Sequence, residues 1–141
     1  MITKEELIRW QTDEEFQLEK VKQDGYNIRY IRIQSEKNCL ESVKQNGNSI
    51  QYINNPSEEI CLEAIRQNGN AIQFINNPSE NVCLEVVKKN GRCIKYINNP
   101  SEKVCLEALH NCKMIDLDKI IKYIDIEKYP DVYEKYCFMI M

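Results

Sequence analysis

The stretch Ser57–Pro78, which reads SEEICLEAIRQNGNAIQFINNP, decides how this chain folds. The same pattern precedes it at Ser35–Pro56 and follows it at Ser79–Pro100, with no residue inserted between the copies. A weaker copy begins at Asp13, and a last copy begins at Ser101 and soon loses the pattern. A fixed period of 22 residues, repeated five times, indicates a repeat protein in which each unit packs mainly on its neighbours.

Each repeat is predicted to contain a helix, a turn and a second, shorter helix. Ser57 precedes two glutamates, so it is expected to cap the N-terminus of the first helix. Gly69 is expected to end that helix in the left-handed conformation. The apolar residues Ala71, Ile72 and Ile75 are spaced for a short helix, and the strict alternation typical of a strand is absent. Apolar residues cover roughly 200° of the first helix, which favours packing against both neighbouring repeats.

The predicted fold is therefore all-α, a right-handed α-solenoid of about five two-helix repeats of 22 residues with capping helices at both ends. We expect a single α-helical repeat domain over residues 1–141. Its parts are an N-terminal cap helix at 1–12, five repeats at 13–112 of which the last is degenerate, and a C-terminal cap at 113–141.

The two ends of the chain have the features expected of caps. Thr3 and Glu6 have capping-box spacing and open a short amphipathic helix. Residues 116–129, DLDKIIKYIDIEKY, are predicted to form another amphipathic helix, followed by a short segment that begins with proline. The last residues are strongly apolar. Phe138 and Ile140 are expected either to cover the end of the stack or to pair with another chain.

Polar residues at equivalent positions form rows on the exposed face of the first helix of each repeat. There is a glutamate row, a mainly basic row and an amide row. One interpretation is a solvated face, in which Glu and Lys three residues apart attract each other by about 0.2–0.5 kcal/mol per pair. The other interpretation is a surface that a partner binds. The residues predicted for this surface are Lys44, Arg66, Gln67, Lys88, Lys89 and Lys95.

Apolar residues form further rows. Two rows are predicted to lie in the core: Leu18, Leu40, Leu62, Leu84 and Leu106, and Ile28, Ile50, Ile72 and Ile94. An aromatic row on the short helix consists of Tyr30, Tyr52, Phe74 and Tyr96. The aromatic row is expected either to pack half-buried or to form a strip that contacts a partner.

Four of the seven cysteines occupy one recurring position inside the apolar arc, as Cys39, Cys61, Cys83 and Cys105. Helices in a stack are separated by roughly 8–10 Å, which is too far for such a row to surround one metal ion. No CxxC motif is present, and His110 is the single histidine. We therefore expect free thiols that pack as small hydrophobic side chains, with no metal and no cofactor.

The composition narrows the classes of function. The 141 residues carry 19 basic and 22 acidic side chains, a net charge of -3, which disfavours non-specific nucleic-acid binding. No apolar run approaches the ~20 residues that cross a bilayer, and the N-terminus lacks the pattern of a secretory signal. Motifs for phosphate loops and for hydrolases are absent. We expect a cytoplasmic protein that is neither an enzyme nor bound to a membrane.

The repeat motif N-P-S-E-x-x-x-L-x-x-V-K-Q-N-G-x-x-I-x-x-I resembles short α-helical repeats of phage and giant-virus proteins. It is also similar to the KQNG-containing repeats of a family of unknown function. The resemblance covers Asp13 to His110 and is best from Asn54 to Pro100, whereas Arg32-Ile33-Gln34 departs from the Asn-Asn-Pro turn. It implies a viral or mobile-element origin and carries no catalytic residues over to this chain.

These observations favour a non-enzymatic module that binds a host or viral protein, for example as an inhibitor of a host defence component, in the host cytoplasm if the gene is viral. Two other functions stay open. A helical repeat protein can bind nucleic acid, although the glutamate row and the net charge oppose this. Identical repeats can also assemble end to end, here through the apolar C-terminus, to form a homo-oligomer.

Overall fold

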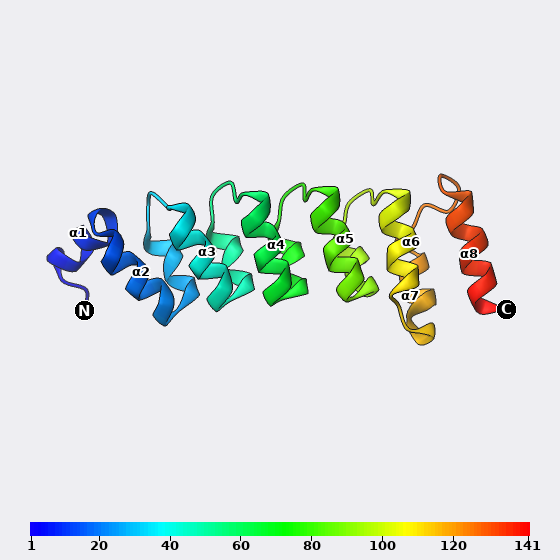
Figure 1. Cartoon of the computed structure of the whole chain (residues 1–141), viewed down its shortest axis with the longest axis horizontal. Helices are drawn as coiled ribbons and strands as arrows, with labels where there is room; N and C mark the ends of the chain where they lie inside the picture. Colours follow the sequence, from blue (N-terminus) through cyan, green and yellow to red (C-terminus); the bar gives the residue numbers. More distant parts are fainter. The chain divides into compact units, whose positions relative to one another are not determined.

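The structure, a computed structural model, describes residues 1–141. It consists of α-helices that alternate with short 3-10 helices, and it contains no β-strand (Figure 1). The chain divides into two compact units, residues 1–75 and 76–141, each with its own set of packed helices. The predicted all-α architecture of repeated helix–turn units is confirmed. The single repeat domain stays a prediction.

The first unit contains three full repeats behind an N-terminal helix. Within it α3 packs between α2 and α4, and the short helix η2 packs between η1 and η3. Each repeat therefore contributes one α-helix and one 3-10 helix to the stack, which settles the type of the short helix. The elements are α1 (Lys4–Thr12), α2 (Glu14–Gln23), η1 (Gly25–Tyr30), α3 (Glu36–Gln45), η2 (Gly47–Tyr52), α4 (Glu58–Gln67) and η3 (Gly69–Phe74).

The second unit begins with a full repeat, α5 and η4, followed by α6 of the degenerate repeat. After α6 the chain forms η5 and α7, and α7 packs against both η4 and α6. The last helix, α8, packs on α6. The elements are α5 (Glu80–Lys89), η4 (Gly91–Tyr96), α6 (Glu102–His110), η5 (Met114–Asp116), α7 (Leu117–Ile121) and α8 (Pro130–Ile140).

The predicted N-terminal caps are confirmed. The Ser57 hydroxyl accepts a hydrogen bond from the backbone N–H of Ile60 at 3.3 Å, and Thr3 forms the expected capping box with Glu6. The cap serine has a second role, because its hydroxyl also donates to Glu36 of the preceding repeat at 2.7 Å. One side chain thus satisfies a helix end and joins two repeats. The other caps of the repeat helices are Asp13, Ser35, Ser79 and Ser101.

The expected left-handed conformation of Gly69 is wrong, because no glycine of the chain has a positive φ. Asn68 ends α4 with an extended backbone (φ −149°). The same residue caps η3, because its side chain accepts a hydrogen bond from the Asn70 N–H at 3.0 Å. Gly25, Gly47 and Gly91, the equivalent glycines of three other repeats, are required by close packing. A Cβ on Gly47 would lie 2.5 Å from the carbonyl oxygen of Ala64 in the next repeat, closer than side chains approach backbone.

The left-handed residues of the chain lie at the junctions between repeats. Asn55, Asn77 and Asn99 have φ values of 48°, 49° and 50°, and each directly precedes a proline. Asparagine adopts this conformation more readily than other residues with a side chain. The asparagine pairs are therefore explained by the turn that leads into each capping serine.

The first junction, Arg32-Ile33-Gln34, lacks these turn residues, and none of them has a positive φ. The Gln34 side chain replaces the missing turn. Its amide donates to the Tyr52 carbonyl at 2.7 Å, and its carbonyl oxygen accepts from the Asn54 N–H at 3.0 Å. This pair of bonds ties the first junction directly to the next repeat.

The core is built from the isoleucine row and from the inner side of the α-helices. Ile28, Ile50, Ile72 and Ile94 are at most 2% exposed, as predicted. The leucine row differs from the prediction: Leu84 is buried, and the other four leucines are half-buried at the edge of the core. At the N-terminal end Trp10 packs edge-on against Phe16, with ring centroids 5.4 Å apart.

The C-terminal region departs from the predicted helix over 116–129. The α-helix α7 ends at Ile121, and turns follow. In these turns the Asp125 carboxylate accepts a hydrogen bond from the Lys128 N–H at 3.0 Å, so this side chain stabilises a local turn in place of a helix. Pro130 then begins α8, where its missing N–H has no cost.

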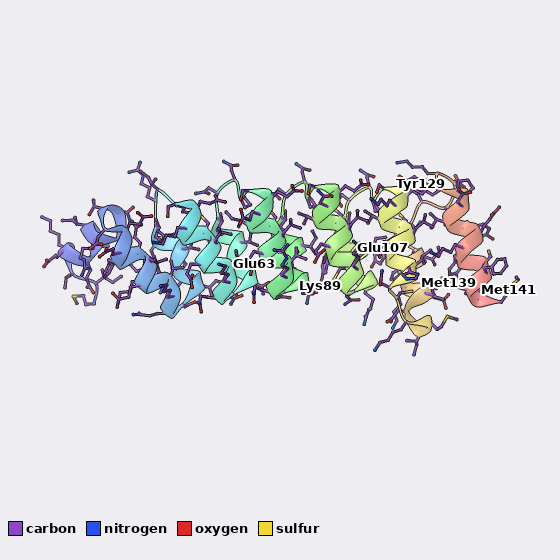
Figure 2. The ribbon with its side chains drawn as sticks, in the orientation of Figure 1. Glu63, Lys89, Glu107, Tyr129, Met139 and Met141 are labelled. Carbon is purple, nitrogen blue, oxygen red and sulfur yellow. The ribbon has the colours of Figure 1, made fainter.

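The apolar end of α8 does not cover the stack. Val132 is the buried residue of this helix, whereas Phe138 is 81% and Ile140 is 53% exposed. The expectation that Phe138 and Ile140 cap the stack is therefore wrong. The stick view in Figure 2 places Tyr129 before the first turn of α8 and Met141 at its other end. Pairing of this apolar end with another chain stays a prediction.

Candidate functional site

The outer face of the α-helices has one hydrogen bond that recurs from repeat to repeat. A glutamate accepts from an amide side chain four residues later, one helical turn along the same face. In α4 the Gln67 amide donates to Glu63 at 2.9 Å, and in α3 the Gln45 amide donates to Glu41 at 2.7 Å. The remaining pairs of this kind are Glu19 with Gln23 and Glu107 with Asn111. The face therefore presents carboxylates and amides held in a repeated arrangement.

Glu63 is the centre of this face in the first unit, and Figure 2 shows it on α4. Besides Gln67, Arg66 lies 3.5 Å from its carboxylate. The hydrogen bond from Gln67 lowers the pKa of Glu63, and Arg66 and Lys44 lower it further by their charges. Two of the predicted surface residues, Gln67 and Arg66, therefore donate to one carboxylate, and Lys44 acts on it through its charge. The glutamate is the member of the group that the prediction left out.

The predicted residues of the second unit are Lys88, Lys89 and Lys95. Lys88 and Lys89 lie in the last turn of α5, where Lys89 is labelled in Figure 2, and both are exposed. Lys95 lies on the short helix η4, with its ammonium 4.6 Å from the centre of the Tyr96 ring. Lys95 lines a hollow of about 160 Å³ that α7 closes from the other side.

This hollow is strongly basic. Arg92 and Lys95 come from η4, and Lys119 and Lys122 come from α7 and its end. Ile120 and Tyr123 complete the lining. Ile120 is 1% exposed, so the floor of the hollow is part of the core.

Asp116 anchors two of these cations. Its Oδ1 atom lies 3.2 Å from Nζ of Lys119 and 3.8 Å from Nε of Arg92. Asp116 is only 7% exposed, whereas the side chains of Arg92 and Lys119 stay more than half exposed. A buried carboxylate therefore forms salt bridges with two cations whose side chains stay largely exposed to solvent. It also lines a second hollow of about 280 Å³, which shares Arg92 with the first.

The sequence contained a signal for this cluster that the prediction did not use. The second and third repeats place neutral amides where the fourth repeat places cations. The signal lies in a comparison of each row across the repeats, and it becomes visible only when departures from the period are examined. The replacements are Gln45 and Gln67 by Lys89, Asn48 and Asn70 by Arg92, and Gln51 and Gln73 by Lys95.

The aromatic row lies at the edge of the 3-10 helices. Tyr30 is 43% and Tyr52 is 37% exposed, and Phe74 and Tyr96 are half-buried. The Arg29 guanidinium lies 4.7 Å from the centre of the Tyr30 ring and donates to its hydroxyl at 2.7 Å. These rings are therefore in contact with neighbouring cations as well as with the core.

The recurring cysteines are buried, and their thiols are poor nucleophiles. Burial, together with the negative charge of a nearby glutamate, raises the pKa of Cys39 and of Cys105 to about 11 in each case. The thiolate, which is the reactive form, is therefore rare at neutral pH. The Cys83 and Cys105 thiols lie 3.9 Å from the proline carbonyl oxygens five residues before them. This weak contact links each helix to the turn in front of it.

The single histidine lines a third hollow, of about 490 Å³, between α6 and α8. The other residues of this hollow are mainly charged, and Glu107 there already accepts from Asn111 at 2.7 Å. The structure contains no group of three or more His, Cys, Asp or Glu side chains with the spacing of a metal site. It also contains no helix that is long and apolar enough to span a membrane.

Comparison with curated proteins and with solved structures found no match for the chain. Comparison with protein families found one family, matched twice in overlapping regions, at residues 13–57 and 36–78. Each match spans about two repeats of the first unit, and the overlap agrees with the period of the sequence. Over residues 13–78 the chain is similar to the domain of unknown function DUF4116.

Proposed function

We propose that this chain is a non-enzymatic module that binds another protein through the outer face of its α-helices. The observation that carries the proposal is the repeated Glu–amide pair with a basic residue beside it, best formed around Glu63. A surface of this kind presents charges of both signs at fixed positions. Such patterning gives specificity for a partner of complementary charge, because wrong partners meet like charges.

The chemistry of the side chains supports binding over catalysis. Buried thiols with a raised pKa are unsuited to nucleophilic attack. Around Glu63 the neighbouring residues lower the pKa of the carboxyl, which keeps it ionised and makes it a weak general base or acid near neutral pH. Because the functional groups are spread along helices and do not converge in a cleft, they are arranged for contact with a surface.

The resemblance of the repeat to those of phage and giant-virus proteins supports a narrower form of the same proposal. In that form the gene is virus- or mobile-element-encoded, and the partner is a host or viral protein in the cytoplasm, for example a component of a host defence system. The narrower form concerns the identity of the partner and leaves the proposed surface unchanged.

Charge reversal tests the surface in each unit separately. Arg66→Glu in the first unit and Lys88→Glu in the second are made in the full chain, which is then used to capture proteins from cells that express it. We expect each variant to reduce the yield of the specific partner several-fold, because a rim charge of the wrong sign slows association. Circular dichroism of each variant checks that the helical content is unchanged.

The matched control is Lys37→Glu with Lys103→Glu. Both lysines are exposed and lie in the first turn of their α-helices, whereas Arg66 and Lys88 lie in the last turn of theirs. The charge change per site is the same, and acidic residues are favourable at that end of a helix. Equal capture by Arg66→Glu, Lys88→Glu and the unchanged chain would refute the assignment. Equal loss in the control would show that only the total charge matters.

A further inference from the structure

The basic hollow between η4 and α7 has the composition of an anion site. We propose that Arg92, Lys95, Lys119 and Lys122 bind the phosphate group of a small phosphorylated molecule. The four residues lie on η4 and on α7 and its end, whereas the face proposed above lies on the outer side of the α-helices; of the residues predicted for that face, Lys95 lines this hollow and Lys89 lines the adjoining one. The anion site therefore goes beyond the proposed function and does not depend on it.

The size of the hollow determines the kind of ligand. Sites for drug-sized molecules have volumes of roughly 300–1,000 Å³, whereas this hollow measures about 160 Å³. It suits a single tetrahedral anion surrounded by four cations. The adjoining hollow of about 280 Å³ shares Arg92 and has room for the rest of a small molecule, such as a second phosphate.

Asp116 forms salt bridges with two of the cations and offsets one of the positive charges around the hollow. It engages Arg92 at Nε, so the two terminal nitrogens of the guanidinium remain available. A guanidinium held in this way presents a fork of N–H donors that matches two phosphate oxygens. Asp116 holds Lys119 at 3.2 Å from the opposite side of the hollow. The donors are therefore positioned before a ligand arrives.

The charge in this region is unbalanced. Asp116 is the single carboxylate that lines the two hollows. A concave surface with one sign of charge attracts ligands of the opposite sign. The buried Cys93 of η4 is affected by the same positive charge: burial raises its pKa, and the charges of Lys95, Arg92 and Lys89 oppose that rise. The cations that line the hollows are Lys89, Arg92, Lys95, Lys113, Lys119 and Lys122.

The repeats themselves serve as an internal reference. Where the fourth repeat has Arg92 and Lys95, the second has Asn48 and Gln51, and the third again has an asparagine and a glutamine. The fold accepts the neutral residues, so the cations are not needed for the short helix. Both replacements add positive charge, and both lie on the wall of the same hollow.

The test is isothermal titration calorimetry with inorganic pyrophosphate and with inorganic phosphate at low ionic strength. The variant is Arg92→Asn with Lys95→Gln, which installs the residues of the second and third repeats and so keeps the fold. We expect saturable binding to the unchanged chain and a loss of about tenfold or more in the double variant, because two charge-assisted donors are removed. Circular dichroism confirms that both proteins are folded.

The matched control is Lys103→Gln with Lys135→Gln, which removes two positive charges from the hollow beside α8. Binding within about twofold of the unchanged chain is expected there, because exposed charges farther away are screened by salt. The proposal is overturned if neither anion binds saturably, or if the two double variants bind equally. Tighter binding of a single-stranded oligonucleotide than of pyrophosphate, lost in the Arg92→Asn, Lys95→Gln variant, would overturn it in favour of a nucleic-acid surface.

Discussion

The short helices η2 and η4 share one backbone and differ in surface chemistry. Their capping asparagines, Asn46 and Asn90, have φ values of −153° and −155°, and each accepts from the N–H two residues later. On this common backbone η2 carries neutral amides, whereas η4 carries Arg92 and Lys95. We call the capping asparagine, the glycine and the buried isoleucine of each short helix its frame. Contacts between repeats determine this frame, and the exposed positions of one repeat can acquire a charge without a change of fold.

The frame is constant because its positions are crowded. Gly25, Gly47 and Gly91 each face the backbone of the following α-helix, and each isoleucine of the row is almost fully buried. The exposed positions of the 3-10 helices, such as Gln51 of η2 and Lys95 of η4, are less crowded and differ between the repeats. Substitutions at frame positions should therefore change stability alike in both helices. Substitutions at surface positions should change the properties of one helix only.

The largest effect is expected from substitution of a frame glycine. A Cβ at Gly47 would lie 2.5 Å from the Ala64 carbonyl oxygen, and one at Gly91 would collide with the carbonyl oxygen of Ala108. Gly47→Ala and Gly91→Ala should each lower the free energy of unfolding by about 1–3 kcal/mol, because the repeats must move apart. Urea unfolding measures the change.

The control for this prediction is Gln51→Ala, an exposed position of the same short helix as Gly47. It should change the free energy of unfolding by no more than about 0.5 kcal/mol. Glycine variants as stable as the control would show that the close approach between repeats does not constrain the chain.

Alkaline pH should destabilise both units through the buried cysteines. The pKa of Cys39 and of Cys105 is raised from an ordinary value of 9.0 to about 11. The folded state holds these protons more tightly, so their contribution is complete below pH 9 and is lost as the pH rises through about 11. Urea midpoints at increasing pH should fall across this range. Cys39→Ala with Cys105→Ala should flatten the fall, and an unchanged slope would contradict the assignment.

Removal of a capping hydroxyl should have a smaller effect. Ser57→Ala and Ser101→Ala each lose a bond to the helix N-terminus and a bond to a glutamate of the preceding repeat. Each should lower the free energy of unfolding by about 1 kcal/mol. Similar losses at both positions would support a frame common to both units. A loss of stability at only one of the two positions would contradict a frame common to both units.

The smallest effect is expected when the surface of η4 is transferred to η2. Asn48→Arg with Gln51→Lys should lower the free energy of unfolding by about 0.5 kcal/mol, because the half-buried Asn48 side chain loses the hydrogen bond that it accepts from Asn68 at 2.9 Å. It should create no second pyrophosphate site, because η2 has no counterpart of Lys119 and Lys122. Calorimetry that finds two equivalent sites would show that the cations of η4 suffice by themselves.

Much of the frame could be predicted from the sequence. The period, the capping serines and the buried isoleucines follow from local patterns, since each depends on residues within one repeat. The role of the glycines could not be predicted, because it depends on a carbonyl in the next repeat. The end of α7 at Ile121 was missed as well, because the carboxylate of Asp125 stabilises a turn within an otherwise amphipathic pattern.

The candidate sites were predicted only in part. Glu63 accepts hydrogen bonds from Gln67 and Arg66 and is influenced by the charge of Lys44, whereas the binding surface predicted from these residues stays a prediction. The basic hollow could not be predicted, because half of its cations follow the point at which the period ends. Asp116 stands one period after Ile94, where a buried isoleucine would be expected, and only the structure reveals that it anchors Arg92 and Lys119.

The most direct test of the account is an amide NMR titration of the unchanged chain with pyrophosphate, since it compares the two short helices within one molecule. The account predicts saturable shifts at the amides of Arg92, Lys95 and Lys119, with none at Asn48 and Gln51 of η2. Equal shifts in both short helices, or no saturable shift in either, would contradict the claim that the fourth repeat carries a site that the others lack.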